Sequence, residues 1–200
     1  MITVVEGPSA AGKSTHAGAF RPALVVGEQP GHVTPDPTAS LEEQSAFWVR
    51  QNEARWARAL RTQAAHGLAV CDTDPLKLHY AWTLARAGQS SAADAFARQL
   101  RLTREAITRR RLGVADLVAC VVPSEAALRE RRAGDTTRRR RQFESHLRLA
   151  GPLAEWYAAL EATDPGHVIR HWPERTHPLV RRAHYDVDLF DAWMARLPSL

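Results

Sequence analysis

Five short apolar runs, separated by longer stretches of helical character, limit the folds open to this 200-residue chain more than any other feature. The runs cover residues 2–5, 23–26, 68–71, 117–122 and 167–169. Most are rich in Val, Leu or Ile and show little alternation with polar residues, as is typical of strands covered on both faces. Because these strands alternate with helices, the sequence predicts an α/β protein with a five-stranded, mainly parallel sheet.

Helical patterns fill the intervals, at residues 41–66, 76–87, 92–112, 125–132 and 138–161. In the first of them Val49, Trp56, Leu60 and Ala64 recur at steps of seven, four and four, which places them along one helix face. The tail at 185–197 has the same spacing and predicts a packing helix or a homodimer contact. The length is that of one domain spanning residues 1–200, since domains run to about 100–200 residues.

The charge points to anionic partners. The net charge is +5, and of 27 cationic residues only Lys13 and Lys77 are lysines. Such a balance suits nucleotides, nucleic acid or a membrane surface. No apolar stretch approaches the roughly 18 residues of a membrane span, and no charged start precedes an apolar region as in a signal peptide. Cys71 and Cys120 each lie in an apolar run, which favours buried thiols in a reducing compartment. We therefore expect a cytoplasmic protein without a membrane partner.

A glycine-rich loop follows the first apolar run and matches G-x-x-x-x-G-K-S. Its glycines allow a tight turn in which successive N–H groups point inward, and the next helix adds its positive end. We expect Lys13 to reach the β and γ phosphates of ATP and the Ser14 hydroxyl to bind Mg²⁺. The alternative is a turn that only joins strand to helix. The predicted ATP-binding residues are Gly7, Pro8, Ser9, Ala10, Ala11, Gly12, Lys13, Ser14 and Thr15.

Carboxylates follow two other apolar runs. Asp72 ends the third run, where parallel sheets place their ligands, so it is predicted to hold Mg²⁺ with Ser14 or to accept the proton of an attacking hydroxyl. Asp74 is a candidate for the substrate site. The alternative for both aspartates is a helix cap ahead of Pro75. Glu28, after the second run, is a candidate hydrogen-bond partner of the acceptor, and Lys77 is either a phosphate contact or a solvated lysine.

Residues 129–141 contain seven arginines among thirteen residues, around a Gly-Asp-Thr-Thr hinge. A charge run of this kind is usually a solvated face or a nucleic-acid patch. In a phosphate-transferring enzyme, however, planar Arg side chains stabilise the charge on the moving phosphoryl group. We therefore expect an Arg-rich lid, with Arg132, Arg138 and Arg141 as the catalytic members.

Together these residues resemble the nucleoside and nucleoside-monophosphate kinases, thymidylate kinase in particular. The likeness lies in the glycine-rich loop, Glu28-Gln29-Pro30-Gly31, Asp72, residues 115–118 and residues 123–131. It implies a P-loop kinase three-layer sandwich, ATP with Mg²⁺, and an acceptor beneath an Arg-rich helical lid. The family has Asp-Arg after its third strand, whereas Thr73 follows Asp72 here. This departure makes a neutral hydroxyl-bearing acceptor easier to accommodate, and small antibiotic phosphotransferases such as chloramphenicol phosphotransferase share the same plan.

The leading hypothesis is therefore an ATP-dependent phosphotransferase acting on a nucleoside, nucleotide or other small hydroxyl-bearing molecule. One alternative is an antibiotic-modifying phosphotransferase. Another is a nucleic-acid-binding ATPase, which is disfavoured because no aromatic residues interleave the basic run. A regulatory GTPase is disfavoured by the absence of an N-K-x-D motif, and zinc by the lack of suitably spaced Cys or acidic partners for the histidines. The candidate substrate residues are Glu28, Trp48, Asp74, Tyr80 and Arg104.

Overall fold

A five-stranded parallel sheet forms the centre of the protein in the computed structural model, which describes residues 1–28, 34–134, 143–173 and 180–200. The strand order is β2-β3-β1-β4-β5, and every neighbouring pair runs parallel. The predicted α/β class and parallel sheet are thereby confirmed. The strands are β1 (Ile2–Glu6), β2 (Val25–Val26), β3 (Ala69–Asp72), β4 (Leu117–Cys120) and β5 (Val168–Ile169).

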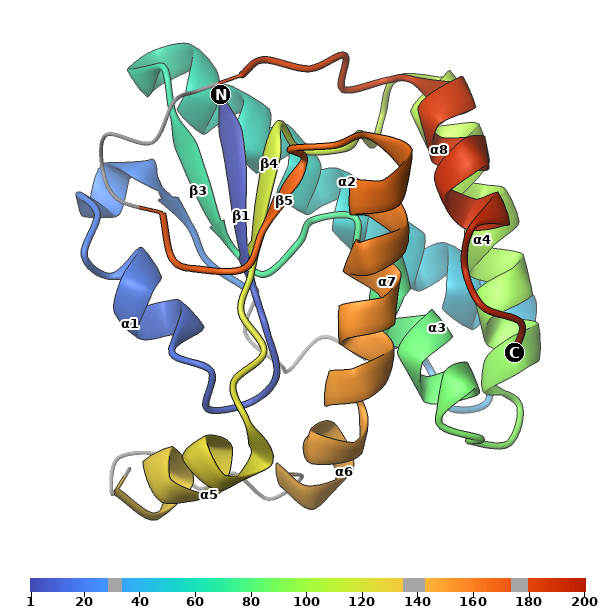
Figure 1. Cartoon of the computed structure of the whole chain (residues 1–200). Helices are drawn as coiled ribbons and strands as arrows, with labels where there is room; N and C mark the ends of the chain where they lie inside the picture. The colour runs from blue at the N-terminus through green and yellow to red at the C-terminus, as the bar shows by residue number, and fades with distance from the viewer. Residues whose placement is uncertain (29–33, 135–142, 174–179) are drawn as a thin grey trace.

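Helices cover both faces of the sheet and make three layers (Figure 1). Helix α1 lies on one face, and α2, α4 and α7 lie on the other, as right-handed crossovers between parallel strands require for this strand order. The helices are α1 (Lys13–Ala17), the 3-10 helix η1 (Pro22–Leu24), α2 (Leu41–His66), α3 (Leu78–Arg86), α4 (Ala92–Thr108), α5 (Glu125–Gly134), α6 (Phe143–Arg148), α7 (Ala150–Thr163) and α8 (Val187–Ala195).

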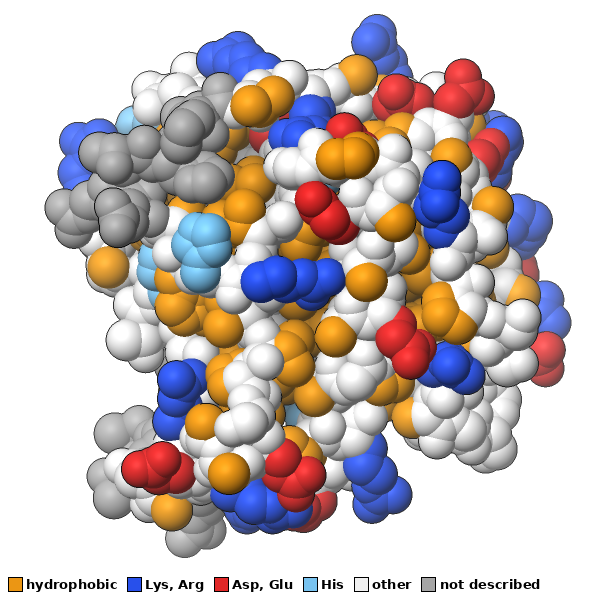
Figure 2. All heavy atoms as spheres, viewed as in Figure 1, with side chains coloured by type: hydrophobic (Ala, Val, Ile, Leu, Met, Phe, Trp, Pro, Cys, Tyr) orange, Lys and Arg blue, Asp and Glu red, His pale blue; other side chains and the backbone are white. Residues whose placement is uncertain are grey.

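The larger core lies between the sheet and the helices of the second face. It includes four almost fully buried tryptophans, of which Trp156 and Trp193 pack at 4.9 Å between ring centroids. The indole N–H of Trp193 also donates to the carbonyl oxygen of Trp156, at 3.1 Å. The tail helix predicted from spacing is therefore present as α8 and packs into the chain's own core. On the molecular surface, acidic and basic side chains gather over α4 and α8 (Figure 2).

Two predicted elements differ most from the structure, while others differ only in their ends. The single helix expected over 138–161 is two helices, α6 and α7, with residues 138–142 outside the described part of the chain. Pro152 explains the break, because proline is tolerated in the first turn of a helix but would remove a hydrogen bond from a continuous one. The strand expected over 23–26 is shortened to Val25–Val26, since Pro22 starts a 3-10 turn.

Asp116 links two chain segments at the end of the sheet where the strands have their amino ends. Its carboxylate accepts hydrogen bonds from the backbone N–H groups of Ile2, at 2.6 Å, and Arg182, at 2.8 Å. The His184 ring lies 3.0 Å from the same carboxylate. These contacts hold the chain segment before α8 against β1. The opposite end of the sheet, at the carboxyl ends of the strands, is left free to form a site.

The carboxyl ends of β1, β3 and β4 lie side by side at that end of the sheet. In register, Val5 lies beside Asp72 of β3 and Ala119 of β4. The glycine-rich loop that follows β1 therefore emerges next to Asp72. Within the described residues, no helix combines the length and the apolar character needed to cross a membrane.

Candidate functional site

A cavity of about 1000 Å³ opens at the carboxyl ends of the strands. The glycine-rich loop forms its floor, and side chains from β3, α3, α5, α6 and α7 form its walls. The lining residues used below are Glu6, Gly7, Pro8, Ser9, Ala10, Ala11, Gly12, Lys13, Ser14, Thr15, His16, Glu28, Asp72, Thr73, Lys77, His79, Tyr80, Thr83, Arg131, His146, Leu149, Leu153 and Trp172.

Two positions of the loop need glycine for different reasons. A Cβ on Gly7 would collide with the backbone carbonyl oxygen of Val121, directly after β4, so the loop can lie this close to the sheet only without a side chain. Gly12 has φ of +101°, a left-handed conformation that glycine adopts without strain. Helix α1 starts directly after it, at Lys13, and directs its positive end into the cavity.

The Lys13 side chain folds back over the loop. Its ammonium donates hydrogen bonds to the carbonyl oxygens of Gly7 and, at 3.2 Å, Pro8, and it lies 3.9 Å from a carboxylate oxygen of Glu6. About a fifth of the side chain is exposed. The ammonium is therefore held by weak neutral acceptors and one carboxylate, within reach of an anion that enters the loop.

Ser14 and Asp72 meet beside the loop, as predicted for a magnesium site. The Ser14 hydroxyl donates to a carboxylate oxygen of Asp72 at 2.9 Å. One hydroxyl and one carboxylate at a cavity floor fit Mg²⁺, which prefers oxygen ligands and keeps several of its waters. The described residues hold no cluster of three or more His, Cys, Asp or Glu side chains suited to a metal.

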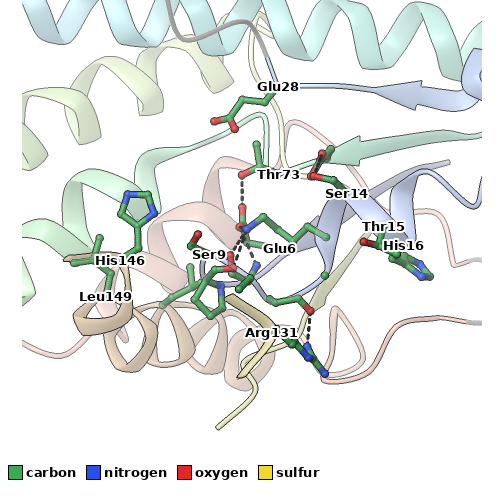
Figure 3. A pocket seen from close by; sticks show the side chains of 18 of the residues that line it. Glu6, Ser9, Ser14, Thr15, His16, Glu28, Thr73, Arg131, His146 and Leu149 are labelled. Carbon is green, nitrogen blue, oxygen red and sulfur yellow. Dashed lines mark hydrogen bonds and ion pairs between the residues drawn. The ribbon is translucent and has the colours of Figure 1, made fainter. Parts of the chain in front are cut away.

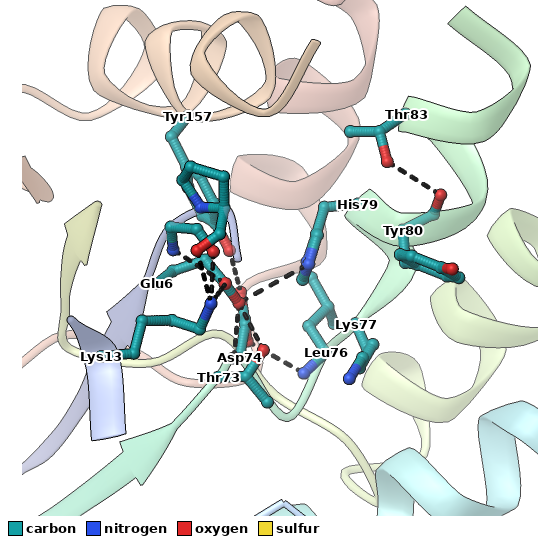
Figure 4. Close-up of polar contacts among 12 residues, drawn as sticks. Glu6, Lys13, Thr73, Asp74, Leu76, Lys77, His79, Tyr80, Thr83 and Tyr157 are labelled. Atoms are coloured by element: carbon teal, nitrogen blue, oxygen red, sulfur yellow. Dashed lines mark hydrogen bonds and ion pairs between the residues drawn. The ribbon is translucent and has the colours of Figure 1, made fainter. Parts of the chain in front are cut away.

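Glu6 lies beneath the loop and joins it to the segment after β3 (Figure 4). It is 3% exposed, accepts from the Thr73 hydroxyl at 2.6 Å and from the backbone N–H groups of Gly7 and Asp74. Burial acts to raise the pKa of Glu6, but His79, Lys13 and these hydrogen bonds together lower it well below its ordinary range. Glu6 is therefore a charged group at neutral pH that fixes the positions of its neighbours.

The segment from Thr73 to Lys77 is strained and held in place by α2. Thr73 and Lys77 both have left-handed φ values, +78° and +46°, which cost energy for residues other than glycine. Arg55, 4% exposed, donates to the carbonyl oxygens of Thr73 and Asp74. Asn52 donates to that of Leu76 at 2.9 Å. The conformation that directs Asp72 toward Ser14 is thus fixed by buried donors.

Asp74 belongs to this supporting network and does not line the cavity. Its carboxylate accepts from the N–H of Leu76 at 2.9 Å and from the Tyr157 hydroxyl at 3.0 Å. Burial raises the pKa of Asp74 to about 6, and the charge of Glu6 adds to this effect. Asp74 is therefore close to titration at neutral pH and acts on the packing rather than on a ligand.

A second wall, which we call the distal wall, faces the loop. It consists of Glu28, Lys77, Tyr80, Thr83, His146, Leu149 and Leu153. Figure 3 places His146 and Leu149 on the opposite side of Ser9 from Thr15 and His16. Lys77 and Glu28 form an ion pair. The Tyr80 and His146 rings lie 6.4 Å apart. The cavity thus has two ends, one beside α1 and one between α3 and α6.

The other predicted site residues lie elsewhere. Trp48 is 39% exposed and packs on Phe47, outside the cavity. Arg104 forms a two-pronged ion pair with Asp191 of α8, at 2.7–3.0 Å. Arg132 pairs with Glu144 at 3.2 Å and does not line the cavity. Arg138 and Arg141 lie outside the described residues, so the predicted lid is described only up to residue 134.

Three lining residues carry contacts that the sequence does not predict. Arg131, the neighbour of Arg132, donates to the carbonyl oxygen of Ala11 in the loop at 3.0 Å. Trp172 stacks on His16 of α1, with 5.2 Å between ring centroids and 15° between planes. The rings offer a flat surface at the end of the cavity beside α1. A tryptophan shortly after β5 is the one sequence signal for this surface.

What the cavity binds must follow from the residues that line it, because no protein-family model and no curated protein matches this chain.

Proposed function

We propose that this chain is an ATP-dependent phosphotransferase that moves the γ-phosphoryl group of ATP to a hydroxyl of a small molecule. The observation that carries the proposal is the loop with its inward Lys13 ammonium, set beside the Ser14–Asp72 pair at the floor of a two-ended cavity. Inward N–H groups and a helix amino end bind phosphate. The second end of the cavity leaves room for an acceptor.

Each described group has a role in this proposal. Lys13 binds the β and γ phosphates, and Arg131 lies at the loop where it stabilises phosphate charge. Ser14 and Asp72 would hold Mg²⁺, which supplies charge neutralisation of the phosphate oxygens when bound. The Trp172 ring provides a stacking surface for the nucleotide base.

A nucleic-acid-dependent ATPase gains no support from the described arginines of α5. Arg129 pairs with Glu125 and Glu144, Arg132 pairs with Glu144, and Arg131 is directed to the loop. Arg129 and Arg132, which are paired with carboxylates of the chain, offer less to a polymer backbone, whereas Arg131 donates to a neutral carbonyl oxygen at the loop.

The test is a Lys13→Met variant assayed for ADP release with ATP, Mg²⁺ and a panel of nucleosides, nucleoside monophosphates and hydroxylated antibiotics. We expect a loss of at least about 100-fold in kcat, as when one charge-stabilising donor is removed from an active site. Arg98→Met is the matched control, because Arg98 is an exposed cation that pairs with Glu42 and does not line the cavity. Acceptor-stimulated ADP release that survives Lys13→Met would refute the proposal.

A further inference from the structure

The distal wall carries opposite charges that cancel each other. Lys77 and Glu28 are the ionic side chains among its seven described residues, and they pair with one another. Across the described lining as a whole, the cations Lys13, Lys77 and Arg131 are matched by the anions Glu6, Glu28 and Asp72. The two cations outside the distal wall lie at the loop, where the triphosphate would bind.

The histidines at this end of the cavity do not add positive charge at neutral pH. Burial lowers the pKa of His79 to about 4, and it outweighs the attraction of Glu6. Burial, with the nearby ammonium groups of Lys13 and Lys77, also lowers the pKa of His146. Both rings are therefore neutral at pH 7, and the described distal wall has no free cation.

An acceptor that already carries a phosphate would meet this wall unfavourably. A phosphate monoester brings a charge of about −1.5 to −2 at pH 7. Lys77 could turn to it only by leaving Glu28, whose carboxylate would then lie beside the phosphate as an unpaired like charge. The Glu28 side chain is 56% exposed, so solvent screens part of this repulsion, and the resulting discrimination against a phosphate is modest.

The rest of the distal wall suits a neutral, ring-bearing molecule. Tyr80 contributes an aromatic ring that is 39% exposed, and Leu149 and Leu153 contribute apolar surface. The Thr83 hydroxyl donates to the carbonyl oxygen of Tyr80, which leaves its own oxygen as an acceptor. Such walls hold a ring by stacking and read its hydroxyl groups by hydrogen bonding.

From these observations we infer that the acceptor is an electrically neutral, hydroxyl-bearing ring compound, and that the Glu28–Lys77 pair is the specificity-determining element that excludes phosphorylated acceptors. This inference rests on the proposed phosphotransferase function. The transfer is balanced: the acceptor oxygen forms a bond to the γ-phosphorus, the bond from that phosphorus to the bridging oxygen breaks, ADP leaves, and the hydroxyl proton passes to solvent or a carboxylate.

The first test measures kcat/KM for ADP release with matched pairs, each nucleoside against its own 5′-monophosphate, with chloramphenicol as a further neutral probe. We expect neutral members to be preferred over their monophosphates by about tenfold, since solvent screens a carboxylate that is more than half exposed. Monophosphates used as well as, or better than, the nucleosides would overturn the inference and leave the phosphotransferase proposal standing. If no compound of either class stimulates ADP release, both fall.

The second test moves the preference by changing the pair. Glu28→Gln frees Lys77, so the preference for neutral acceptors should fall by at least about threefold, whereas Lys77→Met leaves Glu28 unpaired and should not lower it. Glu155→Gln is the matched control, because Glu155 pairs with Arg86 and does not line the cavity. An unchanged preference in Glu28→Gln, with ATP-analogue binding retained as evidence of folding, would overturn the assigned role of the pair.

Discussion

Replacing Asp74 by Asn should change how stability depends on pH. In the folded protein burial raises the pKa of Asp74 from its ordinary 3.8 to about 6. The folded state therefore holds the proton more tightly than the unfolded state, so the contribution of Asp74 is fully present below pH 3.8 and is lost as pH rises through about 6. The shift corresponds to about 3 kcal/mol of unfolding free energy, an upper figure that relaxation of the packing reduces.

The amide that Asp74→Asn introduces could not ionise, and its oxygen could still accept from the N–H of Leu76. The hydrogen bond from Tyr157 would lose its carboxylate acceptor, at a cost of about 1 kcal/mol that does not depend on pH. Between pH 4 and pH 8 the wild type should thus lose about 2.4 kcal/mol more stability than the variant, because the unfolded carboxyl is already partly ionised at pH 4.

The assay is urea unfolding followed by tryptophan fluorescence at pH 4, 5, 6, 7 and 8. All other titrating groups are common to both proteins, so the difference between their curves isolates Asp74. Asp94→Asn, at an exposed position on α4, is the control and should leave the pH profile unchanged. Parallel stability curves for the wild type and Asp74→Asn would refute the assignment of Asp74 as a buried carboxyl whose pKa is raised toward neutral pH.

Three further perturbations test the fold and the loop. Gly7→Ala should lower the melting temperature and weaken binding of an ATP analogue, because its Cβ meets backbone, while Gly151→Ala, whose Cβ meets nothing within 4 Å, should lower neither. Asp116→Asn should destabilise the protein at pH 7 and much less at pH 3, since burial acts to raise the pKa of this carboxyl but its hydrogen bonds and His184 lower it overall; urea unfolding that shows equal losses at both pH values would contradict this. Trp193→Ala should cost about 3–5 kcal/mol in unfolding free energy, as for other large aromatic deletions from a core, and a loss below about 1 kcal/mol would show that α8 is dispensable to that core.

The sheet and the loop are predictable from the sequence because their signals are local. A strand covered on both faces must be apolar along its length, so β1, β3 and β4 stand out wherever they occur. The link between Ser14 and Asp72 follows from topology, because parallel strands bring their carboxyl ends to one edge. Strand β2 is shorter than predicted, because Pro22 diverts the chain.

The arginine beside the loop could not be chosen from the sequence. Arg131 and Arg132 are identical and adjacent, so they differ only in the direction that the turn of α5 gives each side chain. Arg131 is directed to the loop, and Arg132 lies over the Phe143 ring, with 4.7 Å between its guanidinium and the ring centroid. That direction depends on how α5 packs, which periodicity cannot determine within a run of like residues.

Trp48 and Arg104 show the same limit on longer helices. Each is a reasonable partner for an acceptor by residue type. Arg104, however, lies on the face of α4 that is directed to α8, where it pairs with Asp191. Glu6 has a usable signal, since it is the one ionisable residue of β1 and ends a strand that is mostly apolar. A charge in that position is expected to be paired, and its partners are those of the site.

Helix α2 also fixes the spacing between two neighbouring strand ends. Asn52, Arg55 and Arg58 follow one another at steps of three on one side of this helix. The first two donate to carbonyl oxygens after β3, and Arg58 donates to that of Gly27, after β2, at 3.3 Å. Helix α2 therefore fixes the distance between the two segments that carry Glu28 and Lys77. A small rotation or slide of α2 would move both segments together, so the width of the distal wall is set by a helix whose own side chains do not line the described cavity.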